Sequence, residues 1–287
     1  MKYVFFGTPE FAAIILDKLV QTGFIPDAIV CNPDRPAGRK QIMTPPPTKI
    51  LAGIRGFQDK VNMLQPEKLD QKFISSLSKI HDSFDFFIVA AYGKIIPKEV
   101  FGIPDLGTIG VHPSLLPGHR GASPIQAIIL SGNTKTGTTL YLMDEKVDHG
   151  PIIAQKALEN YESGIMNYES LMKKLAELSG DLLIKILPEF LAGKIKAETQ
   201  DEALATFTKK FVAEDGFVKS EDLETAQNQG GEIALEIDRK IRALNPEPGT
   251  WTIKDGKRMK LLEAEITSEN KLKLKKIQIE GGNPVSV

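Results

Sequence analysis

The chain has 287 residues, of which 41% are hydrophobic and 25% charged, and this balance excludes a mainly disordered protein. Its net charge of −1 argues against a surface that binds polyanions throughout. Its length predicts a large domain followed by a smaller one, and its single cysteine, Cys31, excludes an internal disulfide bond and favours a reducing, cytoplasmic compartment. No apolar run reaches the roughly 18 residues of a membrane-spanning helix, and "MKYVFFGTPEF" at the N-terminus is too short for a signal peptide.

The first third of the chain alternates between apolar runs and amphipathic stretches. Residues 2–7, "KYVFFG", predict a strand, and residues 8–23 predict a helix with Thr8 as its N-cap and Pro9 at its first position. Further strands are expected at 27–31 and at 85–93, where "DFFIVAAYG" is typical of a strand covered on both faces. This order of elements predicts an α/β protein with a doubly wound, mostly parallel sheet.

The middle of the chain continues this alternation. Residues 107–121, "GTIGVHPSLLPGHRG", begin as a strand and end in a polar turn, after which Ser123 is expected to form a capping box with Gln126 at the start of a helix. Strands are predicted at 136–144 and 150–159, around a tight connection. Residues 168–193 predict a long amphipathic helix that closes the domain.

The last third has a different composition. Residues 194–207 are polar and are interpreted as a linker, and residues 230–244 predict a helix with Ile233, Ile237 and Ile241 on one side. Two short-strand segments follow, with Asp-Gly at 255–256 as a hairpin turn, and predict a small β-barrel-like module with one helix. Between residues 239 and 276, eleven Lys and Arg stand against five Asp and Glu, an excess of six. A phosphate-rich partner and an ordinary solvated sheet face explain this excess equally well.

Two polar residues are candidates for chemistry. His112 ends an apolar strand, and ligands gather at the carboxyl ends of strands in open parallel sheets. An imidazole titrates near neutral pH and suits proton transfer, although most single histidines are structural. Asp148 lies in the turn "MDEKVDHGPI", where Asp144 is an equal candidate and where both acids could simply form the turn. Only the fold can bring His112 and one of these acids together.

Other motifs are weak or missing. The stretch 32–49 holds Arg35, Arg39 and Lys40 in close order, which suits either a phosphate clamp or a solvated loop. "FGTPEF" does not match the dinucleotide-binding fingerprint, and the sequence has no P-loop, no Gly-x-Ser-x-Gly elbow and no His/Cys cluster with the spacing of metal ligands. We therefore expect no dinucleotide site and no metal site.

Several segments resemble the methionyl-tRNA formyltransferase family: "VFFGTPEFA", "PDRPAGR", "IVAAYGKIIP", "HPSLLPGHRGASPIQ", "MDEKVDHGPI" and "IRALNPEPGTW". They occur in the order of the family and extend from residue 4 to about residue 262. The resemblance implies a Rossmann-like formyltransferase domain at 1–193, a linker at 194–207 and a small OB-like β-barrel that binds tRNA at 208–287. It also implies a monomeric enzyme that moves the formyl group of 10-formyltetrahydrofolate to the α-amine of methionine on initiator tRNA.

The resemblance also assigns roles to individual residues. Its catalytic positions fall on His112, on Asp148 rather than Asp144, and on Gly110, where the family pattern has asparagine. The positions implied for folate binding are Ser114, Leu115, Leu116, Pro117 and Tyr92. Those implied for binding the second substrate are Arg39, as the main tRNA contact, with Arg35, Lys40, Gly7, Thr8 and Pro9.

Gly110 is the departure from the pattern, because glycine has no side-chain donor for a developing oxyanion. Loss of one such donor typically costs about 10²–10³ in rate. Three interpretations stay open: a water or the His112 imidazolium replaces the donor, the enzyme is slower or acts on a changed substrate, or only binding is kept. The alternatives to tRNA formylation are a formyltransferase for an amino sugar nucleotide or glycinamide ribonucleotide, and a non-catalytic folate- or tRNA-binding homologue.

Overall fold

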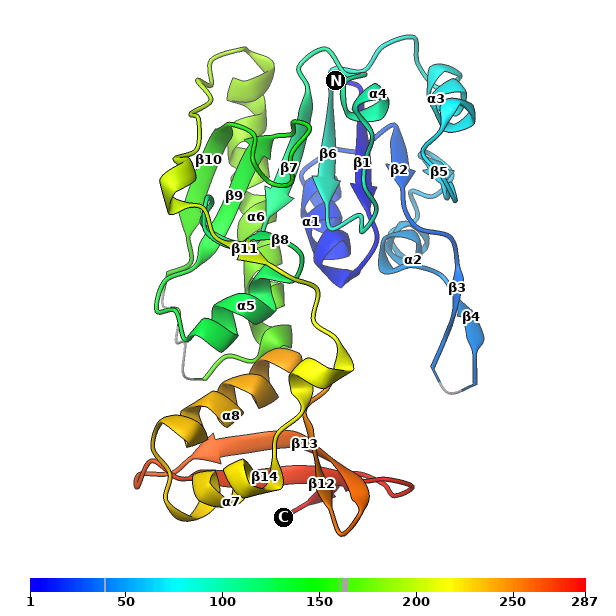
Figure 1. Cartoon of the computed structure of the whole chain (residues 1–287). Helices are drawn as coiled ribbons and strands as arrows, with labels where there is room; N and C mark the ends of the chain where they lie inside the picture. The colour runs from blue at the N-terminus through cyan, green and yellow to red at the C-terminus, as the bar shows by residue number, and fades with distance from the viewer. Residues whose placement is uncertain (39, 160, 162–164) are drawn as a thin grey trace. The chain divides into compact units, whose positions relative to one another are not determined.

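The structure is a computed structural model that describes residues 1–38, 40–159, 161 and 165–287 (Figure 1). The chain forms two compact units. The large unit comprises residues 1–120, 137–158 and 172–206, and the small unit comprises residues 121–136, 159–171 and 207–287. The domain limits expected from the sequence, at 193 and 207, stay a prediction.

The large unit is built on a seven-stranded sheet (Figure 1). Its strand order is β10-β9-β7-β6-β1-β2-β5, with bounds β1 Tyr3–Gly7, β2 Ala28–Val30, β5 Asn62–Leu64, β6 Phe86–Ala90, β7 Thr108–His112, β9 Gly137–Leu142 and β10 Ile152–Ala157. The five strands from β5 to β7 are parallel, whereas β9 and β10 run antiparallel to their neighbours. The mostly parallel α/β sheet predicted from the sequence is confirmed.

Helices cover both faces of this sheet. They are α1 Glu10–Gln21, α2 Pro47–Ile54, α3 Gln71–Ser78, α4 Lys98–Phe101 and most of α6, Tyr168–Leu191. Successive side chains of a strand point to opposite faces. Phe87 of β6 belongs to an apolar cluster with Phe73 of α3 and Val100 of α4. The neighbouring Phe86 packs instead on Phe190 of α6, with ring centroids 6.1 Å apart. The apolar run at 85–93 therefore reflects burial on both sides.

Two predicted helix caps are wrong. Thr8 does not cap α1, whose N-cap residue is Pro9, because the Thr8 hydroxyl instead donates to the carbonyl oxygen of Tyr92 at 3.2 Å. Ser123 precedes helix α5, Pro124–Ser131, but has φ of +56° and makes no capping hydrogen bond. A side-chain cap requires an extended backbone at the N-cap residue, so the left-handed backbone at Ser123 is incompatible with the expected capping box.

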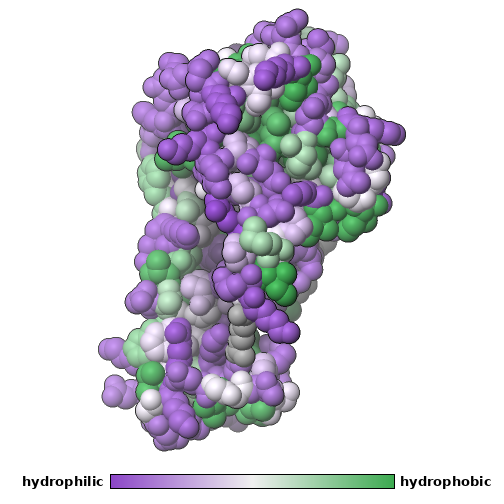
Figure 2. Space-filling model, turned by 90° about the vertical axis from the view of Figure 1, so that its right-hand side faces the viewer, coloured by the Kyte–Doolittle hydropathy of each residue, from purple (hydrophilic) through white to green (hydrophobic). Residues whose placement is uncertain are grey.

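The stretch 32–49, expected as a loop, contains a short hairpin. Strand β3, Arg35–Ala37, pairs antiparallel with β4, Ile42–Thr44. Ile42 and Met43 of this hairpin are exposed. Polar residues cover most of the face of the molecule shown in Figure 2, with smaller apolar patches between them. Lys40 is also exposed, whereas Arg39 lies outside the described residues.

Residues 194–207 contact the large sheet. Glu198 exchanges two backbone hydrogen bonds with Ile152 of β10, both at 2.8 Å. Gln200 is buried, and the 3-10 turn Glu202–Leu204 follows it. Strand β11, Phe207–Thr208, ends this region and pairs with β8, Arg120–Gly121, in a separate two-stranded sheet.

The small unit contains a four-stranded antiparallel sheet. Its order is β12-β13-β14-β15, with bounds Trp251–Lys254, Lys257–Ile266, Leu272–Ile279 and Val285–Ser286. Asp255 and Gly256 have positive φ angles of 50° and 73°, as the predicted Asp-Gly hairpin turn requires. The 3-10 helix Ala213–Gly216 and the helices α7, Ser220–Asn228, and α8, Glu232–Leu244, precede the sheet.

The core of the small unit lies between these helices and the sheet. Ile237 and Ile241 of α8 are buried against Met259 and Leu261 of β13, as the helix pattern predicted. Helix α7 is not predicted from the sequence, because "SEDLETAQN" supplies only Leu223 and Ala226 as buried residues. A cavity of about 660 Å³ in this unit is lined by α7 and by the sheet, and it contains none of the predicted site residues.

Candidate active site

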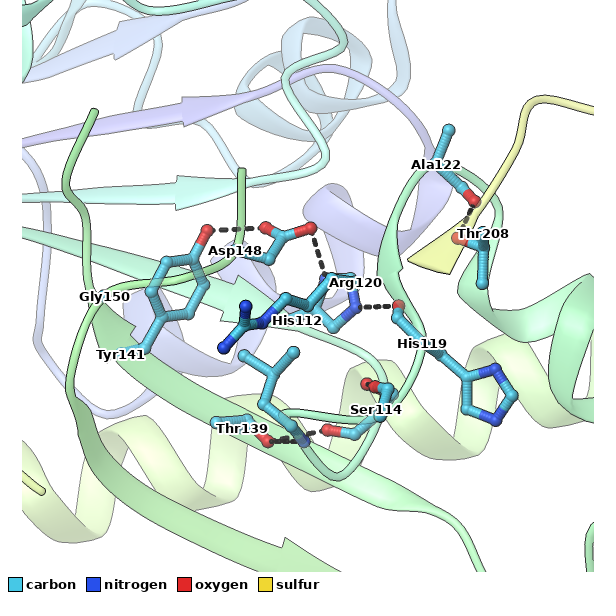
Figure 3. Close-up of polar contacts among 12 residues, drawn as sticks. His112, Ser114, His119, Arg120, Ala122, Thr139, Tyr141, Asp148, Gly150 and Thr208 are labelled. Atoms are coloured by element: carbon cyan, nitrogen blue, oxygen red, sulfur yellow. Dashed lines mark hydrogen bonds and ion pairs between the residues drawn. The ribbon is translucent and has the colours of Figure 1, made fainter. Parts of the chain in front are cut away.

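His112 is the last residue of β7 and is only 5% exposed. Its Nε2 atom donates to the carbonyl oxygen of His119 at 2.8 Å, since a carbonyl oxygen can only accept. Its Nδ1 atom lies 3.5 Å from Oδ2 of Asp148 (Figure 3). Burial lowers the pKa of His119, and the neighbouring His112 lowers it further. The fold thus brings together the histidine and one of the two candidate acids, in an environment with little water.

The structure distinguishes between those two acids. Asp148 lies between β9 and β10 with φ of +49°, and its carboxylate faces His112. Asp144 is bound elsewhere: its side chain pairs with Nδ1 of His149 and accepts from the backbone nitrogen of Lys146 at 2.9 Å. Asp144 therefore serves the turn, and Asp148 is the acid beside the histidine.

Tyr141 of β9 is a third member of this cluster, and no motif in the sequence points to it. Its hydroxyl donates to Oδ1 of Asp148 at 2.7 Å (Figure 3). Burial, together with the negative charge of Asp148, raises the pKa of Tyr141 well above its usual value, so the phenol stays a donor. The residue opposite Tyr141 on β7 is Gly110. The signal that could have found Tyr141 is this cross-strand pairing, which is known only once the register of β7 and β9 is known.

The turn after His112 is held rigidly by side chains of β9 and β10. The Thr139 hydroxyl donates to the carbonyl oxygen of Ser114 at 2.7 Å and accepts from the backbone nitrogen of Leu116 at 3.0 Å. Gln155 donates to the carbonyl oxygen of Leu116 at 2.7 Å. The Ser114 hydroxyl is buried and donates to the carbonyl oxygen of Gly118 at 2.6 Å, so it is used within the turn. Leu115 and Pro117, in contrast, are partly exposed.

Comparison with known proteins establishes the family. Residues 1–187 match the family model described as formyl transferase, and residues 232–282 match that of the formyl transferase C-terminal domain. The chain belongs to the formyl transferase family. It is 37% identical over 314 residues to the methionyl-tRNA formyltransferase of Caldicellulosiruptor saccharolyticus, a match that covers 100% of this chain and 94% of the relative.

Solved formyl transferase structures share the fold. The methionyl-tRNA formyltransferase from Clostridium thermocellum superposes with a TM-score of 0.62 at 17% identity, over 98% of this chain and 100% of that one. The N-formyltransferase from Helicobacter canadensis, solved in complex with folinic acid and dTDP-3-aminofucose, has a TM-score of 0.60 at 16% identity, over 93% of this chain and 88% of that one. Two formyl transferases with different names thus have the architecture of this chain.

The remaining predicted positions of this formyl transferase lie at other strand ends. Tyr92 is buried in the core, edge-on to Phe6 with ring centroids 5.6 Å apart, and burial raises its pKa to about 12. Its carbonyl oxygen accepts from Thr8 and, at 3.1 Å, from the side chain of Asn32. Tyr92 therefore joins the ends of β1, β2 and β6. Gly7 is buried beside it, Thr8 is half-buried and Pro9 is exposed.

The hairpin cations of this formyl transferase lie at the surface. Arg35 forms an ion pair with Glu67 at 2.7 Å, in which both side chains are well exposed. Such an exposed pair is weak and exchanges readily for another anion. Lys40 is likewise accessible.

Arg120 supports the candidate active site, although no motif in the sequence gives it this role. It is 1% exposed, and its guanidinium donates to Oε1 of Gln200 at 3.0 and 2.8 Å and to both carboxylate oxygens of Glu202 at 3.0 and 2.7 Å. Gln200 in turn donates to the carbonyl oxygens of Asp148, at 3.0 Å, and of Gly150, at 2.8 Å. This hydrogen-bonded chain holds the backbone around the candidate catalytic aspartate.

The described residues hold no group of three or more His, Cys, Asp or Glu side chains that could bind a metal ion. Across the same part of the chain, no helix combines the length and the apolar character needed to cross a lipid bilayer.

Proposed function

We propose that this chain transfers the formyl group of 10-formyltetrahydrofolate to the α-amino group of methionine on initiator tRNA. The observation that carries the proposal is the His112–Asp148 pair at the carboxyl edge of a formyl transferase sheet, in a chain matched over its whole length by a methionyl-tRNA formyltransferase. We also propose that the enzyme is monomeric and acts in the cytoplasm, in keeping with its single buried cysteine.

The proposed chemistry is an acyl transfer in which the folate supplies the formyl group and the protein moves protons. In the neutral ring of His112, Nε2 carries the hydrogen and donates it to the carbonyl oxygen of His119. Nδ1 therefore has the lone pair that can accept a proton. A proton taken from the attacking amine then resides on Nδ1, where the Asp148 carboxylate stabilises the imidazolium. The same imidazolium returns a proton to the departing nitrogen, and general catalysis of this kind contributes typically 10²–10⁴-fold.

The turn of residues 114–117 fits the donor because it is rigid and partly apolar. Its backbone groups are held by Thr139 and Gln155, so the partly exposed Leu115 and Pro117 form a fixed surface for a flat reduced pterin. We assign Ser114 and Leu116 to shaping this turn, since both are buried. Tyr92 is buried as well, and we assign it to the support of the strand ends rather than to direct contact.

The small unit supplies a surface for the tRNA. On the face of its sheet opposite the core, Arg258 lies 4.0 Å from the ring centroid of Trp251, and Lys260 is exposed next to them. Basic and aromatic side chains together bind phosphates and bases. We propose that Arg35, Arg39 and Lys40 contact the acceptor end of the tRNA, with the strand-end residues Gly7, Thr8 and Pro9 facing the aminoacyl group.

A formyl-transfer assay with methionyl-tRNA, a 3-amino sugar nucleotide and glycinamide ribonucleotide as competing acceptors tests the proposal. We expect transfer to the tRNA only, a rate at least 10³-fold lower in His112→Ala, and a comparable loss in Asp148→Asn. As a control, Asp144→Asn should keep its activity within a few-fold of wild type. Preferential formylation of either small acceptor, or full activity in His112→Ala, would overturn the proposal.

A further inference from the structure

Gly110 and Tyr141 face each other across the β7–β9 pairing, and the tyrosine ring occupies the space that any side chain at position 110 would need. A Cβ atom built on Gly110 would lie 2.4 Å from two ring carbons of Tyr141 and 2.7 Å from its hydroxyl oxygen. Ordinary van der Waals contacts of a Cβ atom are 3.4–4 Å. Tyr141 is 6% exposed, so its ring has little room to move away. The glycine is thus a steric requirement of this tyrosine.

The hydroxyl of the same tyrosine has a defined partner in the active site. It donates to Oδ1 of Asp148 at 2.7 Å, while Oδ2 of that carboxylate lies 3.5 Å from Nδ1 of His112. The carboxylate therefore has one oxygen held by Tyr141 and the other turned towards the imidazole (Figure 3). A polar side chain at position 110 and the phenol of Tyr141 would compete for one place beside this carboxylate.

We propose that Tyr141 is a positioning residue of the active site: it holds Asp148 beside His112, and its ring fills the place that the asparagine of the family pattern would take at position 110. The polar group beside the reacting centre thus comes from β9 instead of β7. This inference rests on the proposed function for its kinetic consequences. Because the single phenolic hydrogen of Tyr141 is donated to Asp148, Tyr141 positions that carboxylate and does not itself supply a donor for the developing oxyanion.

The protonation state of the buried Tyr141 phenol supports the same role. Burial and the neighbouring carboxylate keep the phenol protonated well above its usual pKa, so it remains a donor throughout the working range of pH. A hydrogen bond from a buried donor to a charged acceptor is among the stronger ones in proteins. The explanation that competes with a positioning role is that the Tyr141 ring only fills the space beside Gly110.

Tyr141→Phe separates these explanations, because it keeps the ring and removes the hydroxyl. We expect kcat to fall about 10- to 100-fold, with both KM values within about threefold of wild type. In an Asp148→Ala background, the same change should have less than a twofold effect, since Tyr141 acts through that carboxylate. Tyr3→Phe is the matched control: it removes a buried hydroxyl that donates to the carbonyl oxygen of Phe24 at 2.6 Å and should leave kcat unchanged. A kcat for Tyr141→Phe within twofold of wild type would refute the proposal.

A second pair of variants tests the steric half. Gly110→Asn should lose activity at least as strongly as Tyr141→Phe, because its side chain displaces the ring. Adding Tyr141→Ala should raise that activity at least tenfold, since the asparagine then has the space. An equal or lower activity in the double variant would contradict the coupling.

The NMR spectrum of ¹⁵N-histidine-labelled protein gives a readout that does not depend on the substrate. The His112 imidazole resonances, identified by their absence in His112→Ala, should shift in Tyr141→Phe and not in Tyr3→Phe. Unshifted resonances would count against the positioning role even if the wild type formylates tRNA. Shifted resonances in a protein that does not formylate tRNA would instead refute only the proposed function.

Discussion

The replacement of Arg120 by methionine tests whether the backbone around Asp148 depends on a buried guanidinium. Methionine keeps most of the length and volume of the side chain but none of its donors. Oε1 of Gln200 then loses both of its hydrogen bonds from Arg120, at 3.0 and 2.8 Å. Gln200 is 5% exposed, so water cannot easily replace them.

The expected loss of stability follows from the hydrogen bonds that Gln200 makes with Arg120 and with the backbone at Asp148 and Gly150. A buried acceptor without a partner costs about 1–3 kcal/mol, and a loosened Gln200 weakens two hydrogen bonds of about 0.5–1.5 kcal/mol each, to the carbonyl oxygens of Asp148 and Gly150. Glu202 is exposed, and its ion pair adds little. If the two bonds lose about half of their free energy, the total is about 2–4 kcal/mol, which corresponds to a fall in Tm of roughly 5–15 °C.

Thermal unfolding monitored by circular dichroism measures this loss, and Arg55→Met is the matched control. Arg55 also makes two charged hydrogen bonds, to Asp17 at 2.6 and 2.7 Å, but its side chain is 45% exposed. We expect its Tm to stay within about 2 °C of wild type. Equal shifts for the two variants would refute the argument from burial. In formyl transfer, Arg120→Met should lower kcat at a temperature where the variant is fully folded, whereas Arg55→Met should not.

Two further predictions concern pH and salt. Burial raises the pKa of Cys31 to about 11 and that of Tyr92 to about 12, so the folded protein keeps protons that the unfolded chain releases. The free energy of unfolding should therefore decrease as the pH rises from 9 towards 12. Urea titrations that give the same free energy of unfolding at pH 8 and pH 10.5 would contradict this. The Kd for tRNA should rise steeply with salt concentration. In Lys260→Glu, log Kd should rise less steeply with log salt concentration, and the affinity for folate should not change. Filter binding at several salt concentrations measures this dependence, and equal slopes for wild type and variant would exclude Lys260 from the tRNA interface.

Periodicity along the sequence predicts the elements of this protein better than their ends. The continuous apolar run of residues 85–93 predicts a buried strand, and the amphipathic pattern from residue 168 predicts a long helix. Both are confirmed, as β6 at Phe86–Ala90 and α6 at Tyr168–Leu191. The Ser123 capping box has the right residues, but the left-handed backbone at Ser123 prevents it. The loop at 32–49 hides a hairpin because β3 and β4 are three exposed residues each and bury no apolar side chain.

Only part of the site can be predicted in this way. His112 stands out because it ends an apolar strand, but its partner depends on how the turn of residues 143–151 folds, and Asp144 and Asp148 are equivalent in the sequence. Tyr141 looks like an ordinary strand residue until the register places it opposite Gly110. Arg120 and Gln200 are 80 residues apart, and no local pattern links them.

The arrangement around Asp148 explains why a departure from a motif is compatible with an intact site. A residue other than glycine at φ of +49° is strained and persists only when its surroundings determine it. Tyr141 donates to its carboxylate, Gln200 donates to its backbone carbonyl oxygen, and Arg120 in turn holds Gln200. Tyr141 and Gln200 lie outside the segments that carry the family resemblance, whereas Arg120 lies within the segment of residues 112–126. The proposed catalytic pair is therefore positioned in part by residues outside those segments, and we expect a change at position 110 to act on the site through Tyr141.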